Sequence, residues 1–122
     1  MSDRDHEIVV YGDKKAMCTQ RVLILLEELG LKYAVKDVDL EKNEHKSMSF
    51  LTLNPFAKVP VVKYTGSSGD TKTLFESRSI LRYISTKHDD NKDLYPDVFT
   101  DVWLEAESQT LNPLLSTIVY EK

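Results

Sequence analysis

The sequence predicts an α/β domain with a mixed four-stranded sheet, followed by one further C-terminal helix. Strand-like and helix-like patterns alternate in the first half of the chain, which is typical of parallel strands joined by a helix. Two strand-like runs then flank the turn residues 65–70, as in a β-hairpin. Hydrophobic residues make up 41% and charged residues 30% of the 122 residues, which is the composition of a folded domain and not of a disordered chain.

The first half of the chain predicts a strand, a helix and a second strand. Residues 8–11 form a short apolar run that ends at Gly12, and we expect a buried first strand there. Apolar residues then recur at helical spacing over residues 17–29, and Gly30 follows at the place where a glycine commonly ends a helix. Residues 33–40 carry valines between charged residues and predict the second strand.

The second half of the domain predicts a loop, a hairpin and a closing helix. Residues 41–50 are charged and polar, and they predict a loop or a short irregular helix. We expect the hairpin strands at residues 59–64 and 71–75. Ser77 is a good N-cap for a helix whose apolar stripe continues to near His88.

The predicted domain boundaries follow from a change in composition after the closing helix. Residues 1–88 form the sheet domain, residues 89–97 a charged linker with Pro96 near its end, and residues 98–122 a further helix. Pro113 should kink or restart that helix, because a proline breaks the interior hydrogen-bond ladder. Its apolar stripe has few partners within the chain, and exposed apolar surface of that size usually contacts a partner. We therefore expect a dimer, an exchanged helix or a fragment of a longer protein.

Composition excludes several classes of function. The net charge is −4, with 16 basic and 20 acidic residues, which argues against a basic nucleic-acid surface. Cys18 is the only cysteine, so we expect no internal disulfide, and no cysteine–histidine spacing predicts a metal site. The first residues are charged and lack an apolar stretch, and no apolar run approaches the roughly 18–20 residues of a membrane span. We expect a cytoplasmic protein with no membrane partner.

Five segments carry a resemblance to a known family. They are Val10-Tyr11-Gly12, Thr19-Gln20-Arg21-Val22-Leu23, Glu44-His45-Lys46, Asn54-Pro55-Phe56-Ala57-Lys58-Val59-Pro60 and Leu74-Phe75-Glu76-Ser77-Arg78. In this order and spacing, the chain resembles a cytosolic glutathione transferase, closest to the plant phi class. The resemblance implies a thioredoxin-like fold with a cis peptide bond before Pro60, and residues 98–122 resemble the first helix of the truncated all-α second domain. It also implies a homodimer that uses glutathione as co-substrate.

The resemblance implies a role for each end of the glutathione tripeptide. Glu76 would pair with the α-ammonium group of the γ-glutamyl unit, and Ser77 would bind its carboxylate at a helix N-terminus. Val59 would make two backbone hydrogen bonds to the cysteinyl unit, as a strand edge binds a peptide. Lys58 replaces the glutamine that is usual in the phi class, and with His45 and Lys46 it would bind the glycyl carboxylate. Taken without the resemblance, these loop charges would be solvent-exposed and nothing more.

The chain departs from the phi class at the residue that activates the glutathione thiol. Phi members place a serine five residues before the arginine that corresponds to Arg21, and this chain has Ala16 there. Loss of such a donor costs on the order of 100-fold in rate. Cys18, in the first turn of the helix, is the candidate catalytic residue that remains, although a small half-buried helix residue is the simpler interpretation. Thr19 also has a hydroxyl, which we expect to serve the helix terminus.

Three functions are consistent with these residues. The first is a detoxifying glutathione transferase that joins glutathione to small hydrophobic electrophiles. The second is a non-catalytic ligand carrier or assembly module that keeps the glutathione site. Ala16 favours this function, because it cannot activate the glutathione thiol. The third is a glutathione-dependent thiol transferase that acts through Cys18. The surface that selects the second substrate lies mostly in the helical second domain, so the sequence does not identify that substrate.

Overall fold

The computed structural model describes residues 6–95 and 97–120, with Pro96 of the predicted linker and both chain ends outside the described residues. The chain divides into two compact units, one up to Tyr83 and one from Ile84 onward, and each is described by itself.

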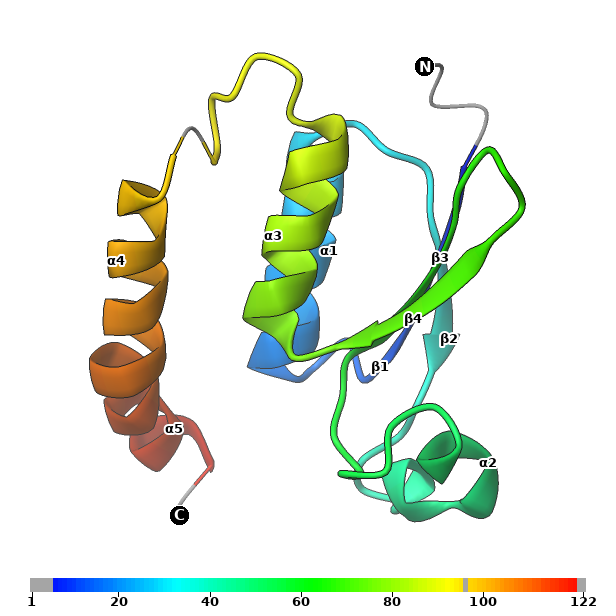
Figure 1. Ribbon diagram of the computed structural model, residues 1–122. Helices are drawn as coiled ribbons and strands as arrows, with labels where there is room; N and C mark the ends of the chain where they lie inside the picture. Colours follow the sequence, from blue (N-terminus) through cyan, green and yellow to red (C-terminus); the bar gives the residue numbers. More distant parts are fainter. Residues whose placement is uncertain (1–5, 96, 121–122) are drawn as a thin grey trace. The chain divides into compact units, whose positions relative to one another are not determined.

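A mixed four-stranded sheet forms the centre of the first unit (Figure 1). Its strands are β1 (Glu7–Gly12), β2 (Ala34–Asp37), β3 (Val61–Thr65) and β4 (Thr71–Phe75), in the order β2-β1-β3-β4. β1 and β2 are parallel, whereas β3 is antiparallel to both β1 and β4. The predicted parallel pair, hairpin and mixed sheet are confirmed.

Helix α1 (Met17–Glu28) ends where the sequence predicted. Gly30 has φ 67°, and its N–H donates to the Glu27 carbonyl at 3.1 Å. The Leu31 N–H donates to the Leu26 carbonyl at 3.0 Å, which completes the paired bonds of a glycine-terminated helix. A glycine is needed here because the left-handed conformation disfavours a side chain.

One face of the sheet packs against α1 and the first part of α3 (Ser77–His88). Val10 of β1 pairs with Val62 of β3, and both are fully buried. Tyr64, on the same face, meets Tyr83 of α3 edge-on with 5.3 Å between the ring centres. At the end of β1, a Cβ on Gly12 would lie 2.6 Å from the Thr19 hydroxyl oxygen, so only glycine lets α1 approach so closely. This contact fixes the start of α1 against the end of β1.

A smaller cluster covers the other face at one end of the sheet. Val38, Phe50 and Val61 are buried there. The segment that covers them contains a 3₁₀ turn at Glu44–Lys46 and helix α2 (Met48–Leu51), as expected for a short irregular helix. Ser47 caps α2, because its hydroxyl accepts the Phe50 N–H at 3.2 Å.

β2 is shorter than the predicted residues 33–40, and the predicted starts of β3 and α3 also differ from the structure. β3 begins at Val61 and not at Val59, because Pro60 has no N–H to donate to a ladder. The Val59–Pro60 peptide bond is cis, as the resemblance implied. Ser77 is not the N-cap of α3 but its first residue, since the Glu76 carbonyl accepts the Ile80 N–H at 3.0 Å. Glu76 itself has φ 71°, and this left-handed residue turns the chain from β4 into α3.

The second unit contains the C-terminal part of α3, a turn, and the helices α4 and α5. The buried Asp89 carboxylate accepts the N–H groups of Asp93, Leu94 and Tyr95 at 3.1, 2.8 and 2.9 Å. Burial is the largest influence on the pKa of Asp89 and would raise it, but the three N–H groups outweigh burial and hold this pKa below its ordinary value.

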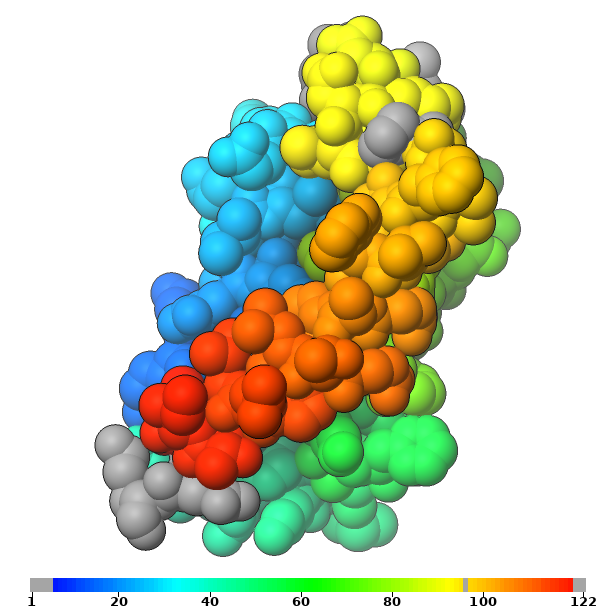
Figure 2. Space-filling view, turned by 90° about the vertical axis from the view of Figure 1, so that its left-hand side faces the viewer, coloured from blue at the N-terminus to red at the C-terminus, as the bar shows by residue number. Residues whose placement is uncertain are grey.

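The predicted interruption before Pro113 is present. α4 (Phe99–Ala106) passes through a π-helical turn (Glu107–Leu111) into α5 (Asn112–Tyr120). A wider turn suits this position because Pro113 cannot donate the usual helical hydrogen bond. Residues 99–119, orange to red in Figure 2, expose many apolar side chains. They include Phe99, Val102, Trp103, Leu111, Leu114, Leu115, Ile118 and Val119. Among the described residues, no helix combines the length and apolarity that crossing a membrane requires.

Candidate functional site

The sheet register brings three loops to one edge of the first unit. Tyr11 at the end of β1 pairs with Val61 at the start of β3, and Val61 pairs with Phe75 at the end of β4. The loops that follow β1, precede β3 and follow β4 therefore leave the sheet where these strand ends lie side by side. We call this end of the strands the sheet edge. This edge holds the predicted residues around Ala16, Val59 and Ser77.

We call Glu76 and Ser77 the glutamyl end of this edge. Ser77 is 4% exposed, and its hydroxyl oxygen accepts a hydrogen bond from Nη1 of Arg21 at 2.8 Å. Arg21 lies on α1, 56 residues away in the sequence. In the sequence, Arg21 marks only the phi-class pattern, and this contact could not be predicted from it. A bond between such distant residues is invisible until the helices are packed.

The backbone of Val59 is held by the turn before it. Buried Asn54 donates from its side-chain amide to the Lys58 carbonyl at 2.9 Å and accepts the Phe56 N–H at 3.0 Å. Ala57 in this turn has φ 57°. Within the described part of the chain, the Val59 N–H and C=O have no hydrogen-bond partner. They are therefore available to a bound peptide, whereas the Lys58 side chain is exposed.

His45 and Lys46 lie in the 3₁₀ turn between β2 and β3. His45 is half-buried, and its Nδ1 is buried without a hydrogen-bond partner among residues 6–95 and 97–120. Lys46 is exposed, and no ion pair joins it to another described residue. Both residues and Lys58 lie in the segment between β2 and β3, and α2 separates the two residues from Lys58 in the sequence. A buried ring nitrogen without a partner normally requires a water or a ligand.

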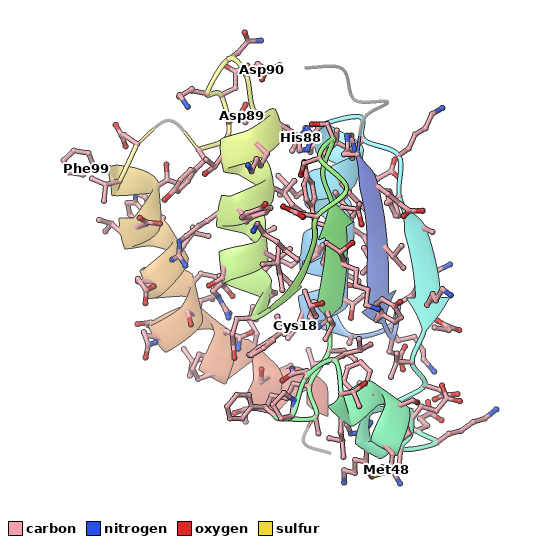
Figure 3. All side chains as sticks on the ribbon, turned by 45° about the vertical axis from the view of Figure 1, so that its right-hand side comes forward. Cys18, Met48, His88, Asp89, Asp90 and Phe99 are labelled. Atoms are coloured by element: carbon pink, nitrogen blue, oxygen red, sulfur yellow. The ribbon has the colours of Figure 1, made fainter. Side chains whose placement is uncertain are left out.

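We call Ala16 and Cys18 the thiol end. Ala16 is 8% exposed and occupies the N-cap of α1 without a side-chain cap. Cys18 is half-buried in the first turn of α1 (Figure 3). The expectation that the Thr19 hydroxyl serves the helix terminus is wrong. Thr19 is fully buried against Gly12, and its hydroxyl has no hydrogen-bond partner in the part of the chain that the structure describes.

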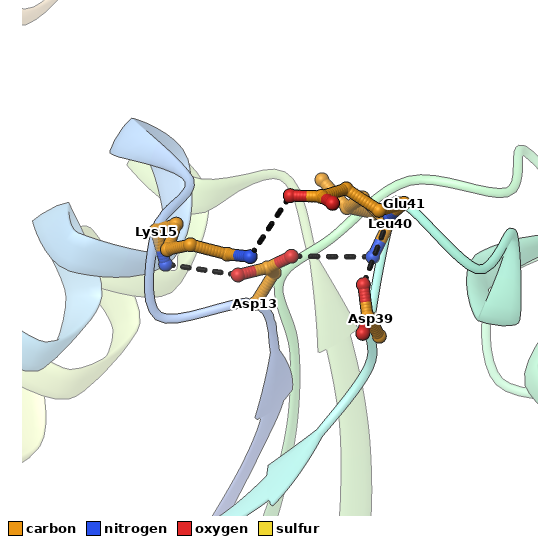
Figure 4. Close-up of polar contacts among 5 residues, drawn as sticks. All are labelled: Asp13, Lys15, Asp39, Leu40 and Glu41. Atoms are coloured by element: carbon orange, nitrogen blue, oxygen red, sulfur yellow. Dashed lines mark hydrogen bonds and ion pairs between the residues drawn. The ribbon is translucent and has the colours of Figure 1, made fainter.

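Asp13 ties the loop before Ala16 to the loop after β2 (Figure 4). Its buried carboxylate accepts the Lys15 N–H at 2.9 Å and the Leu40 N–H at 3.2 Å. The Lys15 N–H is the largest influence on the pKa of Asp13 and lowers it, burial opposes this, and the Leu40 N–H lowers it further. The pKa of Asp13 therefore lies below its ordinary value. The Lys15 ammonium group pairs with Glu41 at 3.1 Å, which raises the pKa of Lys15. Sequence patterning did not single out Asp13.

A separate hollow of about 400 Å³ lies beside α2. Its lining consists of Tyr11, Lys36, Asp37, Val38, Glu44, Ser47, Ser49, Phe50 and Leu53. Tyr11 is half-buried at the wall of this hollow. No residue predicted to bind glutathione lines this hollow.

The sequence model of the family described as "Glutathione S-transferase, N-terminal domain" matches residues 7–86. The chain belongs to this family. It is 35% identical over 119 residues to glutathione S-transferase F13 of Arabidopsis thaliana, which covers 92% of this chain and 52% of that protein. It is 37% identical over 121 residues to probable glutathione S-transferase GSTF1 of Oryza sativa subsp. japonica, covering 93% of this chain and 53% of that protein. The predicted resemblance to plant phi-class transferases is confirmed.

Solved structures of the family agree with the fold. Poplar glutathione transferase F1 superposes with a TM-score of 0.81 at 33% identity, over 95% of this chain and 57% of that one. A glutathione transferase homolog from Drosophila mojavensis, solved with bound glutathione, gives a TM-score of 0.79 at 26% identity, over 94% of this chain and 55% of that one. The thioredoxin-like fold is confirmed. The chain spans about half the length of the relatives that it matches.

Proposed function

We propose that this chain binds glutathione at the sheet edge and transfers it to small hydrophobic electrophiles. The observation that carries the proposal is the backbone of Val59, whose N–H and C=O have no partner among the described residues, at the same sheet edge as buried Ser77. Family membership over residues 7–86 supports glutathione as the peptide that occupies this edge.

The glutamyl and cysteinyl units would bind through different groups. The Val59 N–H and C=O pair with the cysteinyl backbone as a short strand edge does. The Ser77 hydroxyl and the N-terminal backbone of α3 donate hydrogen bonds to the γ-glutamyl carboxylate, and the helix dipole favours a negative charge there. The exposed carboxylate of Glu76 pairs with the ligand ammonium group.

The glycyl carboxylate would bind to the basic residues of the loop before β3. Lys58 and Lys46 are exposed and supply positive charge, and the buried Nδ1 of His45 can gain the partner that it lacks among the described residues. Each exposed lysine contributes modestly, because solvent screens such charges. We expect the glutamyl end to contribute more to affinity than the glycyl end.

Ala16 limits the rate of the transfer step in this proposal. Ala16 supplies no side-chain donor at the N-cap of α1, so the dipole of the helix is what remains at this end to stabilise the bound thiolate. The same observation favours a second function, a non-catalytic carrier or assembly module that retains glutathione binding. A third function, thiol transfer through Cys18, needs Cys18 to form a mixed disulfide with glutathione.

Calorimetric titration with glutathione tests the binding site. Ser77→Ala should weaken binding about tenfold, the loss expected when a hydrogen bond to a charged group is removed. Ser79→Ala is the matched control, since Ser79 is exposed on the same helix two residues later, and it should bind as the parent does. Equal affinity of the parent and Ser77→Ala would exclude the proposed site.

Two activity assays separate the three functions. Conjugation of a generic aromatic electrophile measures transfer, and reduction of a mixed glutathione disulfide measures thiol exchange. We expect slow conjugation that Cys18→Ala leaves unchanged. Disulfide reduction that disappears in Cys18→Ala would support the thiol transferase, and binding without either activity would leave the carrier.

We also propose that the protein acts in the cytoplasm as a homodimer, with detoxification of electrophiles as its role. The dimer is supported by the exposed apolar residues of α4 and α5, because apolar surface of this extent usually contacts a partner. Light scattering coupled to size exclusion tests it, and a monomer at micromolar concentration would exclude the dimer.

A further inference from the structure

The hydrogen bond between Arg21 and Ser77 leaves the hydroxyl proton of Ser77 without an acceptor. Arginine carries only donors, so Nη1 of Arg21 occupies a lone pair of the Ser77 oxygen at 2.8 Å. No described residue accepts a hydrogen bond from the Ser77 hydroxyl, although the residue is 4% exposed. Buried hydroxyl groups normally use their donor, so this proton points to an acceptor on a ligand.

We propose that Arg21 is a positioning and specificity-determining residue that makes Ser77 a hydrogen-bond donor for a carboxylate. This inference rests on the proposed function, because it concerns the γ-glutamyl end of the same site. Arg21 occupies one of the two lone pairs of the Ser77 oxygen, so the hydroxyl proton is left to bind an acceptor, and an ionised carboxylate is a strong acceptor. A ligand without a carboxylate at this place leaves the proton unpaired.

The charge of Arg21 strengthens this selection in two ways. A hydroxyl that accepts a bond from a guanidinium group is polarised and becomes a better donor, because hydrogen bonds in a chain reinforce one another. Ser77 is buried and Arg21 is half-buried, so solvent screens the positive charge less than at an exposed site. Both effects favour an ionised carboxylate over a neutral group at the same place.

A structural role would give a different result. Arg21 joins α1 to the start of α3, so its removal could loosen the domain and weaken every ligand alike. A role through Ser77 affects only ligands that carry the γ-glutamyl carboxylate. The measurement that separates the two is the ratio of two affinities in one protein sample, since partial unfolding lowers both equally.

The experiment titrates the full chain with glutathione and with γ-aminobutyryl-cysteinylglycine, which is glutathione without its α-carboxylate. The variants are Arg21→Met, Arg21→Lys, Ser77→Ala and the double variant Arg21→Met/Ser77→Ala. We expect the parent to prefer glutathione over the analogue, and this preference to fall about tenfold in Arg21→Met. Arg21→Lys should retain part of the preference, because it keeps one donor and the charge. The double variant should lose no more than Ser77→Ala loses alone.

Each remaining outcome overturns a stated part of the argument. If Ser77→Ala lowers the preference and Arg21→Met leaves it unchanged, Arg21 does not act through Ser77, and the inference fails while the proposed function stands. Equal weakening of both ligands by Arg21→Met leaves only a structural role for Arg21. If Arg21→Met does not fold, a preference in Arg21→Lys equal to that of the parent also overturns the inference. No glutathione binding by the parent overturns the proposed function itself.

Discussion

The glutamyl end and the thiol end of the candidate site are built differently. At the glutamyl end, buried Ser77 is held by Arg21 from another helix, 56 residues away. At the thiol end, the N-cap of α1 is Ala16, which has no polar side-chain atom. The end that would hold the ligand depends on packing across the whole domain. The end that would activate it depends on a single side chain.

This difference means that binding and activation can be lost independently. The helix contacts that position Ser77 also hold the first unit together, so losing them would cost stability. Replacing one N-cap residue leaves β1, α1 and their packing in place. A chain of this family can therefore keep a glutathione site while its conjugation rate falls, and the thiol end is where such a change costs the fold least.

The largest expected effect is a gain of activity at the thiol end. Ala16→Ser adds a hydroxyl at the N-cap of α1, where its oxygen can accept a helix N–H and its proton can reach the thiolate. We expect conjugation to rise on the order of 100-fold. The free energy of unfolding should rise by about 1 kcal/mol from the new cap. Steady-state conjugation and urea unfolding measure the two effects.

Ala16→Asp is the matched control for this change. Its carboxylate caps the helix and interacts well with the dipole, but it has no proton to donate to the thiolate at neutral pH. We expect it to raise stability without raising conjugation. An equal rise in activity for both variants would mean that helix stability, and not the hydroxyl donor, limits the reaction.

The next effect concerns the loop that precedes the thiol end. Asp13→Asn keeps one acceptor for the N–H groups of Lys15 and Leu40 but turns an amide N–H toward the other. The cost to the free energy of unfolding is about 1–3 kcal/mol. Glutathione affinity should change little, since Ser77 and Val59 do not contact Asp13 in the structure. Asp70→Asn, at an exposed turn position, is the control and should stay within about 0.5 kcal/mol.

The effect of Asp13 depends on pH, with a sign that its lowered pKa determines. The pKa of Asp13 is lower in the folded chain than in the unfolded one, so the carboxylate stabilises the fold above its unfolded pKa of about 4. This contribution disappears as the pH falls through the folded pKa. The difference in stability between the parent and Asp13→Asn should therefore be full at pH 7 and shrink in acid. A difference that stays constant down to pH 2 would contradict the assignment.

Sequence patterning predicted the elements of this fold because each has a local signature. The apolar run of residues 8–11, the glycine after α1 and the turn residues 65–70 each fix a boundary within a few residues. Pro60 moved the start of β3 by two residues, since a proline cannot donate to the ladder at its own position. The resemblance supplied Val59 and Ser77 as binding residues, and their roles remain predictions.

The residues that sequence patterning missed act over distance. Arg21 contacts Ser77, Asp13 contacts Leu40, and both pairs meet only when separate elements are packed. Asn54 was part of a recognised segment, but its role in holding the backbone before Val59 depends on a turn with a left-handed residue. Polar side chains that hold loops together lack the periodicity that reveals a core, so the sequence did not separate them from ordinary surface polarity.

The smallest effect is a gain of stability in the turn before Val59. Ala57 has φ 57°, a conformation that costs a residue with a Cβ about 1–2 kcal/mol and costs glycine little. Part of this gain is lost because glycine is more flexible when unfolded, so Ala57→Gly should stabilise the chain by about 0.5–1 kcal/mol. Ala34→Gly, in strand β2, is the control and should destabilise it by a similar amount. Glutathione affinity should stay unchanged in Ala57→Gly, because the bonds of Asn54 already hold this turn. A loss of both stability and affinity would show that the conformation of Ala57 is needed to present the Val59 backbone to glutathione. Glutathione binding would then depend on a single residue of this turn, as activation depends on a single residue at the thiol end.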